Sequence, residues 1–157
     1  MATTFTATRG ASTFPIAQSH IGGTVCQAWG TIALGTNIVD GDIWQMCWVP
    51  KGATITGGFI HIEDIDTGTE AADLMIGWAA NGTDDADPNG LLLAHVFTGD
   101  ISVHLDIASS KVFFGGVLTG AGPKTLAAKT LIQVEANTAA DTFAAGQMTV
   151  CVDYISP

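Results

Sequence analysis

Short runs of apolar residues alternate with polar residues along most of the chain, and glycine, proline, asparagine and aspartate separate the runs. Alternation with a period of two is typical of strands that bury one face. Eight segments show this character: 24–34, 42–49, 53–65, 73–80, 91–98, 111–118, 130–136 and 147–155, with 101–107 as a candidate ninth. The pattern predicts an all-β fold, a jelly-roll-like two-sheet β-sandwich of about eight antiparallel strands.

The first 22 residues differ from the rest because they are rich in threonine, serine and alanine and have no sustained period. We expect residues 1–22 to form an extended N-terminal arm and residues 23–157 to form one sandwich domain. Phe5, Phe14 and Ile16 are then candidates for contact with a neighbouring subunit or the capsid. Deleting the arm should leave the sandwich folded.

The segment DIWQMCWV at 42–49 is apolar on both sides. Trp44, Met46 and Trp48 share one face of a regular strand, while the opposite face is also largely apolar. Two interpretations remain open: the strand is central and covered on both sides, or it lies at a subunit contact. Under the second interpretation these three residues are interface candidates.

Charged residues make up 13% of the chain, against about 25% in typical soluble domains. Such a surface suggests a subunit that faces other protein. Lys plus Arg is 5 and Asp plus Glu is 15, so the formal net charge is -10. This charge disfavours binding to nucleic acid through phosphates and to anionic membranes.

The chain has three widely spaced cysteines, Cys26, Cys47 and Cys151, and this odd number argues against a disulfide framework. We expect them to be buried thiols, which fits synthesis in a reducing cytosol. No apolar run approaches the length of about 18 residues that a transmembrane helix needs. The N-terminus lacks the basic and apolar regions of a secretory signal.

The stretch DDADPNG matches the first half of an EF-hand loop through Asp85, Asp87 and Asn89. The bidentate glutamate that this loop requires is replaced by Val96. The stretch is either a shallow calcium site in a β loop, with Asp84 as a further ligand, or a solvated connection built from turn-forming residues. We expect the second, and therefore no metal or cofactor.

Other catalytic signals are fragmentary. His61 and Glu63 lie two residues apart, as in part of a cupin-type metal site, but two polar residues on a solvent-facing strand explain the pair more simply. The other histidines are His20, His95 and His104, and the last two stand alone in their strands. No nucleophile elbow or phosphate-binding glycine motif is present, and the acidic pairs in EDID and TDDAD are ordinary in an acidic protein. We expect no catalytic residues and no enzyme activity.

Four tryptophans could form a platform on which sugar rings stack, as in lectin-like modules. Because Trp44, Trp48 and Trp78 lie inside apolar strands, we favour packing in the core or at an interface.

The segment GTNIVDGDIWQMCWVPKGATITGGFIHIEDIDTGTEAADLMIGWA, the acidic loop after it and the closing strand TVCVDYIS follow an order found in tailed-bacteriophage virion proteins. Over residues 35–155 the chain resembles small jelly-roll decoration (cement) proteins of phage capsids. The resemblance implies a structural virion protein on the capsid exterior, made in the host cytoplasm, that stabilises the capsid by bridging its subunits. The implied partners are the major capsid protein and the chain itself, as a homotrimer.

Two other functions remain open beside the resemblance. One is a glycan- or host-binding β-sandwich module of a phage fibre or tail, and the other is a cupin-type enzyme. An exposed aromatic patch would favour the glycan-binding module.

Overall fold

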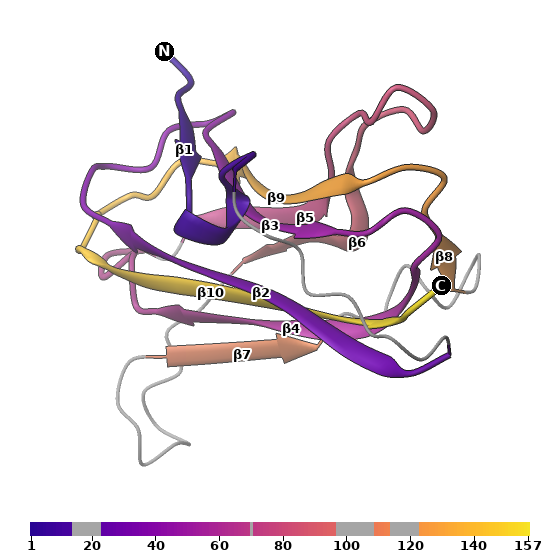
Figure 1. Cartoon of the computed structure of the whole chain (residues 1–157). Helices are drawn as coiled ribbons and strands as arrows, with labels where there is room; N and C mark the ends of the chain where they lie inside the picture. The colour runs from indigo at the N-terminus through magenta and orange to yellow at the C-terminus, as the bar shows by residue number, and fades with distance from the viewer. Residues whose placement is uncertain (14–22, 70, 97–108, 114–122) are drawn as a thin grey trace.

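The computed structural model describes residues 1–13, 23–69, 71–96, 109–113 and 123–157. The described chain is built from strands and one short 3-10 helix (Figure 1). The strands are β1 (Thr4–Thr6), β2 (Val25–Leu34), β3 (Ile43–Val49), β4 (Thr54–Glu63), β5 (Asp73–Trp78), β6 (Asp87–Val96), β7 (Ser109–Phe113), β8 (Lys124–Thr125), β9 (Thr130–Thr138) and β10 (Gly146–Ile155), and the helix is η1 (Thr8–Gly10). Within these residues no helix is long and apolar enough to cross a membrane.

The strands form two packed sheets. Sheet A has the order β1-β3-β9-β5-β6, and sheet B has the order β2-β10-β4-β7, with β8 paired to β4. The chain passes from one sheet to the other between β2 and β3, β3 and β4, β4 and β5, and β9 and β10, while β5 and β6 are antiparallel neighbours. This is the strand order of a jelly roll, so the predicted fold class is confirmed.

The eight predicted strands match eight of the observed ones closely, whereas the short strands β1 and β8 were not predicted. One predicted start differs informatively. The sixth strand begins at Asp87, whereas the sequence predicted a start at residue 91. The end of the acidic stretch therefore belongs to β6. The candidate ninth strand, 101–107, lies outside the described residues.

The core lies between the sheets. Met148, Val150, Val152 and Tyr154 of β10 are each at most 1% exposed, as their alternation predicts. Side chains of this size each stabilise the fold by about 1.5–3 kcal/mol when they leave water. The three cysteines form no disulfide; Cys47 and Cys151 are buried as expected, and Cys26 is half-buried.

A β-bulge in β3 changes which side chains share a face. Trp44 pairs with Val134 and Cys47 pairs with Ile132, so the register shifts at Met46. The bulge places Cys47 on the same face as Trp44 and turns Trp48 to the outer face. The expectation that Trp44, Met46 and Trp48 share one face is therefore wrong.

Trp44 and Met46 are 3% and 0% exposed and belong to the core. For these two residues the structure supports the interpretation of a central, covered strand, and their assignment as interface candidates is corrected. Trp48 is half-buried.

The N-terminal residues pack on their own domain. Thr4–Thr6 pairs in parallel with β3, and the ring of Phe5 stacks on Trp44 at a centroid distance of 5.9 Å. Ala7 is 2% exposed and donates its backbone N–H to the carbonyl of Gln45. The edge of β3 thus offers backbone partners and an aromatic surface. For residues 1–13 this packing on the chain's own domain replaces the expected contact with a neighbouring subunit or the capsid, whereas the end of the extended arm at residue 22, with Phe14 and Ile16, lies outside the described residues.

Candidate functional site

The candidate calcium residues are divided between a loop and a strand. Asp85 precedes β6, and its backbone carbonyl accepts a hydrogen bond from the indole Nε1 of Trp78 at 3.1 Å. Asp87 and Asn89 lie in β6, where Asp87 pairs with Trp78 of β5. Among the described residues, no three His, Cys, Asp or Glu side chains come together as metal ligands would.

Asp84 joins two connections at one end of the sandwich. One carboxylate oxygen accepts from the amine of Lys124 at 3.0 Å. The other accepts from Asn81 Nδ2 at 2.9 Å and from the backbone N–H of Ala127 at 3.1 Å. The hydrogen bonds from Asn81, Lys124 and Ala127, in that order of size, lower the pKa of Asp84. The acidic connection is therefore tied to the segment between β8 and β9.

Asp66 joins two connections at the other end of the sandwich, and the sequence did not single it out. Its carboxylate accepts backbone N–H groups from Ala71 at 2.8 Å, Ala72 at 3.0 Å, Asp141 at 3.1 Å and Thr142 at 2.9 Å. Burial by itself raises the pKa of Asp66, but the four hydrogen bonds outweigh it and lower the pKa from 3.8 to about 2. Asp66 fixes the β4–β5 connection to the β9–β10 connection.

A third carboxylate holds the N-terminal segment. Asp42 is 2% exposed and accepts the backbone N–H of Thr3 at 2.7 Å and that of Val39 at 2.9 Å. The indole of Trp48 adds a hydrogen bond to the carbonyl of Gly10 at 2.9 Å. The segment is thus bound through backbone groups along its length.

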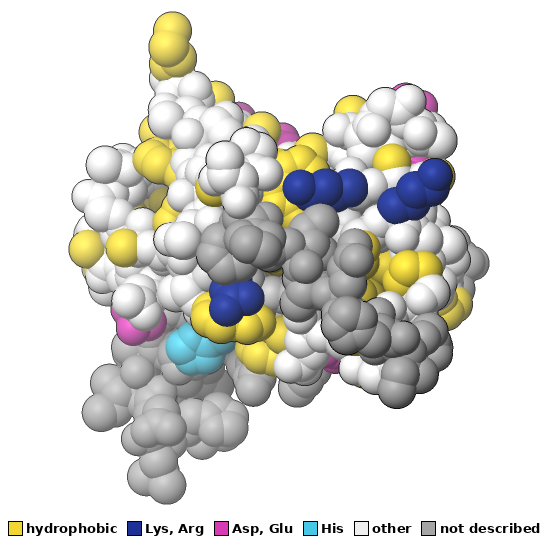
Figure 2. All heavy atoms as spheres, viewed as in Figure 1, with side chains coloured by type: hydrophobic (Ala, Val, Ile, Leu, Met, Phe, Trp, Pro, Cys, Tyr) yellow, Lys and Arg dark blue, Asp and Glu magenta, His cyan; other side chains and the backbone are white. Residues whose placement is uncertain are grey.

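Basic side chains lie over three of the tryptophan rings. The guanidinium of Arg9 lies 3.8 Å from the centre of the Trp29 ring. The other two pairs are Lys129 over Trp48 at 4.3 Å and Lys124 over Trp78 at 5.2 Å. On the face of the molecule that Figure 2 shows, basic side chains (dark blue) lie against hydrophobic side chains (yellow). These contacts occupy ring faces on which a sugar could otherwise stack.

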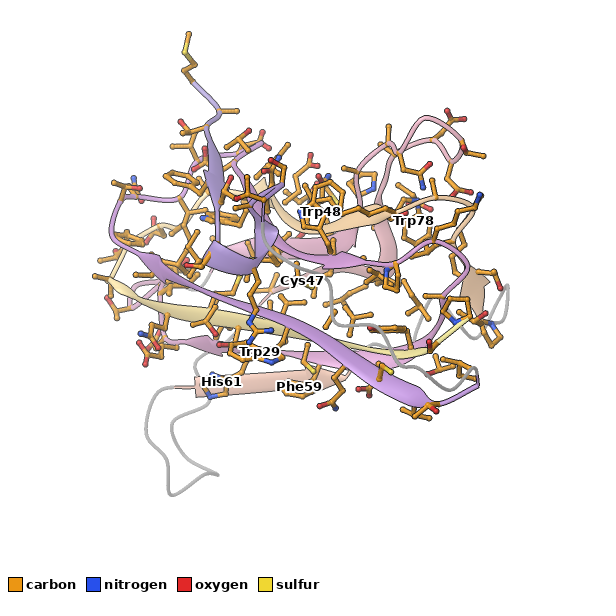
Figure 3. The ribbon with its side chains drawn as sticks, in the orientation of Figure 1. Trp29, Cys47, Trp48, Phe59, His61 and Trp78 are labelled. Atoms are coloured by element: carbon orange, nitrogen blue, oxygen red, sulfur yellow. The ribbon has the colours of Figure 1, made fainter. Side chains whose placement is uncertain are left out.

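The outer face of sheet B carries a row of apolar side chains. Register places Trp29 of β2, Cys151 of β10 and Phe59 of β4 side by side. Figure 3 shows Trp29 and Phe59 on the side of sheet B that faces away from sheet A. Near the chain's C-terminal end, Val25 pairs with Ile155 on the same face. We call Val25, Trp29, Phe59, Cys151 and Ile155 the apolar strip.

The remaining candidate groups do not assemble into a catalytic site in the described part of the chain. His61 lies opposite Thr149 in the sheet, while Glu63 accepts the backbone N–H of Gln147 at 2.9 Å. His95 lies in β6, and His20 and His104 lie outside the described residues.

The buried cysteine of β3 is also unsuited to nucleophilic chemistry. Burial, followed by the proximity of Cys151, raises the pKa of Cys47 from 9.0 to about 12. The nucleophilic form of a cysteine is the thiolate, so a raised pKa makes Cys47 an inert core residue.

Comparison with known proteins gives a match at the level of structure. No protein-family model and no curated protein matches the sequence. A chain of "Capsid of Ralstonia phage GP4" is similar at a TM-score of 0.76 and 16% identity, over 98% of each chain. A chain of "Cyanophage Pam1 capsid asymmetric unit" is similar at a TM-score of 0.63 and 22% identity, over 93% of this chain and 95% of that one.

A third match is a chain of "Acidic stable capsid structure of Helicobacter pylori bacteriophage KHP30", at a TM-score of 0.55 and 12% identity, over 87% of this chain and 91% of that one. At these identities the likeness shows a shared fold. That fold extends over almost the whole of each chain.

Proposed function

We propose that the chain is a structural protein of a bacteriophage virion that decorates the capsid and stabilises it by bridging capsid subunits. The observation that carries the proposal is the whole-length match, at a TM-score of 0.76, to a chain in a phage capsid. Two further matched structures are also phage capsids. A decoration protein needs a rigid body with fixed loops, and the carboxylates of Asp42, Asp66 and Asp84 fix the loops here.

The proposed partners are the major capsid protein and further copies of this chain, as a homotrimer on the capsid exterior after synthesis in the host cytoplasm. The low share of charged residues, 13%, suits a surface that is covered by protein. The net charge of -10 opposes direct contact with the packaged nucleic acid and with anionic membranes.

The alternative, a glycan- or host-binding module of a fibre or tail, receives less support. Trp29 is the most exposed tryptophan among the described residues, at 42%, and Arg9 lies over its ring. Trp44 and Trp78 are 3% and 7% exposed, so they present little surface to a ligand. Glycan binding is therefore treated as the alternative result in the test below.

The test compares virions of the encoding phage with virions that lack this gene. We expect the purified protein to bind the deficient capsids at a fixed ratio to the major capsid protein. Bound protein should raise the temperature at which capsids release their DNA. Electron cryomicroscopy should place it on the exterior, and sedimentation equilibrium of the free protein should give a trimer mass. Protein found at fibre or tail positions, with binding to host glycans, would overturn the proposal.

A further inference from the structure

The chain contains two Asn–Gly pairs, at 81–82 and at 89–90, and the structure holds them differently. Asn81 and Gly82 lie in the connection between β5 and β6, which projects from the sandwich (Figure 1). Asn89 and Gly90 lie within β6. An asparagine side chain that precedes glycine is open to attack by the backbone nitrogen of that glycine, because no Cβ obstructs the approach. The surroundings of each pair therefore decide which one reacts.

Gly82 is free to bring its backbone nitrogen toward the side chain of Asn81. It is exposed, its φ is +86°, and no heavy atom of the described chain, its own neighbours apart, lies within 4 Å of the position that a Cβ would take. Glycine adopts such a positive φ without strain, so the turn can rearrange around it. Gly90 is buried, and the ring of Trp78 packs on it, so the same movement in β6 would displace the tryptophan.

The carbonyl of the Asn81 side chain is already polarised by backbone donors. Its Oδ1 accepts the N–H of Thr83 at 2.9 Å and that of Asp84 at 2.7 Å. A nucleophile that attacks Cγ drives negative charge onto Oδ1, and preorganised N–H donors stabilise such charge. The turn therefore holds the amide that reacts, the glycine nitrogen and the donors that stabilise the intermediate.

The amide nitrogen of the same side chain belongs to the network around Asp84. Asn81 Nδ2 donates to Oδ2 of Asp84 at 2.9 Å and to the hydroxyl of Thr130 at 2.8 Å. These bonds restrain the amide in the closed loop. The side chains of Asp84 and its partner Lys124 are 17% and 32% exposed, so water competes for their bonds. Local opening of the loop then frees the amide of Asn81.

We propose that Asn81–Gly82 is a deamidation site, and that its reaction irreversibly loosens the β5–β6 connection. A base in the solvent takes the proton of the Gly82 backbone N–H. The nitrogen then forms a bond to Cγ of Asn81, and the Cγ–Nδ2 bond breaks as Nδ2 takes a proton from water and leaves as ammonia. Water opens the resulting succinimide ring to aspartate or isoaspartate. In sum, one water is consumed and one ammonia is released.

Both products lack the donor that Asn81 supplied. Two carboxylates that repel each other replace its bond to Asp84, and the hydroxyl of Thr130 loses the same donor. Lys124 and the backbone N–H of Ala127 stay bound to Asp84, so the connection is weakened while the sheets keep their packing. The inference goes beyond the proposed function and does not depend on it, because the reaction needs only this chain and water.

The first test incubates the full-length protein at mildly alkaline pH and follows the mass gain of deamidation at each asparagine by peptide fragmentation in a mass spectrometer. Asn89 is the matched internal control, because both residues precede glycine. We expect Asn81 to react about tenfold faster than Asn89, because ring closure within one chain depends on the geometry of the reacting atoms. In denaturant the two should react at similar rates. Equal rates in the folded protein, or a faster reaction at Asn89, would overturn the site.

The second test asks whether the reaction loosens the connection. Asn81→Asp reproduces one product, and Asn89→Asp makes the same change of charge within β6. We expect Asn81→Asp to lower the midpoint of denaturant unfolding and Asn89→Asp to leave it close to that of the wild type. If Asn81→Asp does not fold, wild-type protein aged in solution and separated by charge allows the same comparison with fresh protein. Equal midpoints for Asn81→Asp, or for aged protein, and their controls would show that deamidation leaves the connection intact.

Discussion

Two aspartates near opposite ends of β5 each join two connections of the sandwich, but their surroundings differ. Asp66 precedes the strand, is 1% exposed and binds four backbone N–H groups. Asp84 follows the strand, and its side chain is 17% exposed beside a Lys124 side chain that is 32% exposed. Solvent and salt screen an exposed ion pair more than they screen backbone donors around a carboxylate that is 1% exposed. We therefore expect the anchor without a cation, Asp66, to be the stronger one.

The largest expected effect is the loss of the buried anchor. Asp66→Ala leaves the N–H groups of four residues without their acceptor, and we expect it to lower the free energy of unfolding by about 3 kcal/mol. Denaturant titration would measure the loss. Asp141→Asn is the matched control, because that exposed side chain makes one long hydrogen bond, 3.4 Å to Thr69. A loss as small as that of the control would show that the two connections are held by other contacts.

The next effect is the pH dependence of the same anchor. The pKa of Asp66 is lowered from 3.8 to about 2, so its contribution is full above 3.8 and disappears as the pH falls through about 2. The gap between these values corresponds to a contribution on the order of 2 kcal/mol to the free energy of unfolding at neutral pH. We expect the stability difference between wild type and Asp66→Asn to be constant near neutral pH and to shrink below 3.8. A difference that persists unchanged at pH 2 would contradict the ionised anchor.

A smaller effect is expected at the other end of β5. Lys124→Met removes the cation beside Asp84 but keeps an apolar stem near the ring of Trp78. We expect a loss of stability smaller than that of Asp66→Asn, and one that shrinks as salt is added. The loss for Asp66→Asn should not depend on salt. Equal salt sensitivity in the two variants would remove the distinction between the two anchors.

Local alternation was enough to predict most of the fold. In β10 the buried side chains Met148, Val150, Val152 and Tyr154 recur at every second position, which is a signal within one strand. In β3 the same argument failed, because the bulge at Met46 shifts the pairing by one residue. A bulge depends on the partner strand and has no signature in a run of apolar letters.

The anchors could not be predicted, because their partners are distant backbone groups. Asp66 accepts from Asp141 and Thr142, which lie 75 and 76 residues away. Backbone N–H groups are present at every residue except proline, so the sequence does not mark the ones that a carboxylate will meet. The docking of Thr4–Thr6 on β3 was missed for the same reason, since its register joins residues 39 apart. The acidic stretch, by contrast, could be recognised as a candidate calcium site because its candidate ligands are close together in the sequence.

The smallest effect, and the last comparison, concerns the rest of that acidic stretch. Asp84 is held by Lys124, but the candidate ligands Asp85, Asp87 and Asn89 are divided between a loop and the start of β6. Calcium bound there at ten times its Kd would stabilise the fold by about 1.4 kcal/mol. We expect instead that neither calcium nor a chelator changes the melting temperature, because a glutamate ligand is lacking and Val96 stands in its place. Asp85→Ala combined with Asp87→Ala should fold normally, and a calcium-dependent rise in melting temperature that this double substitution abolishes would establish a metal site.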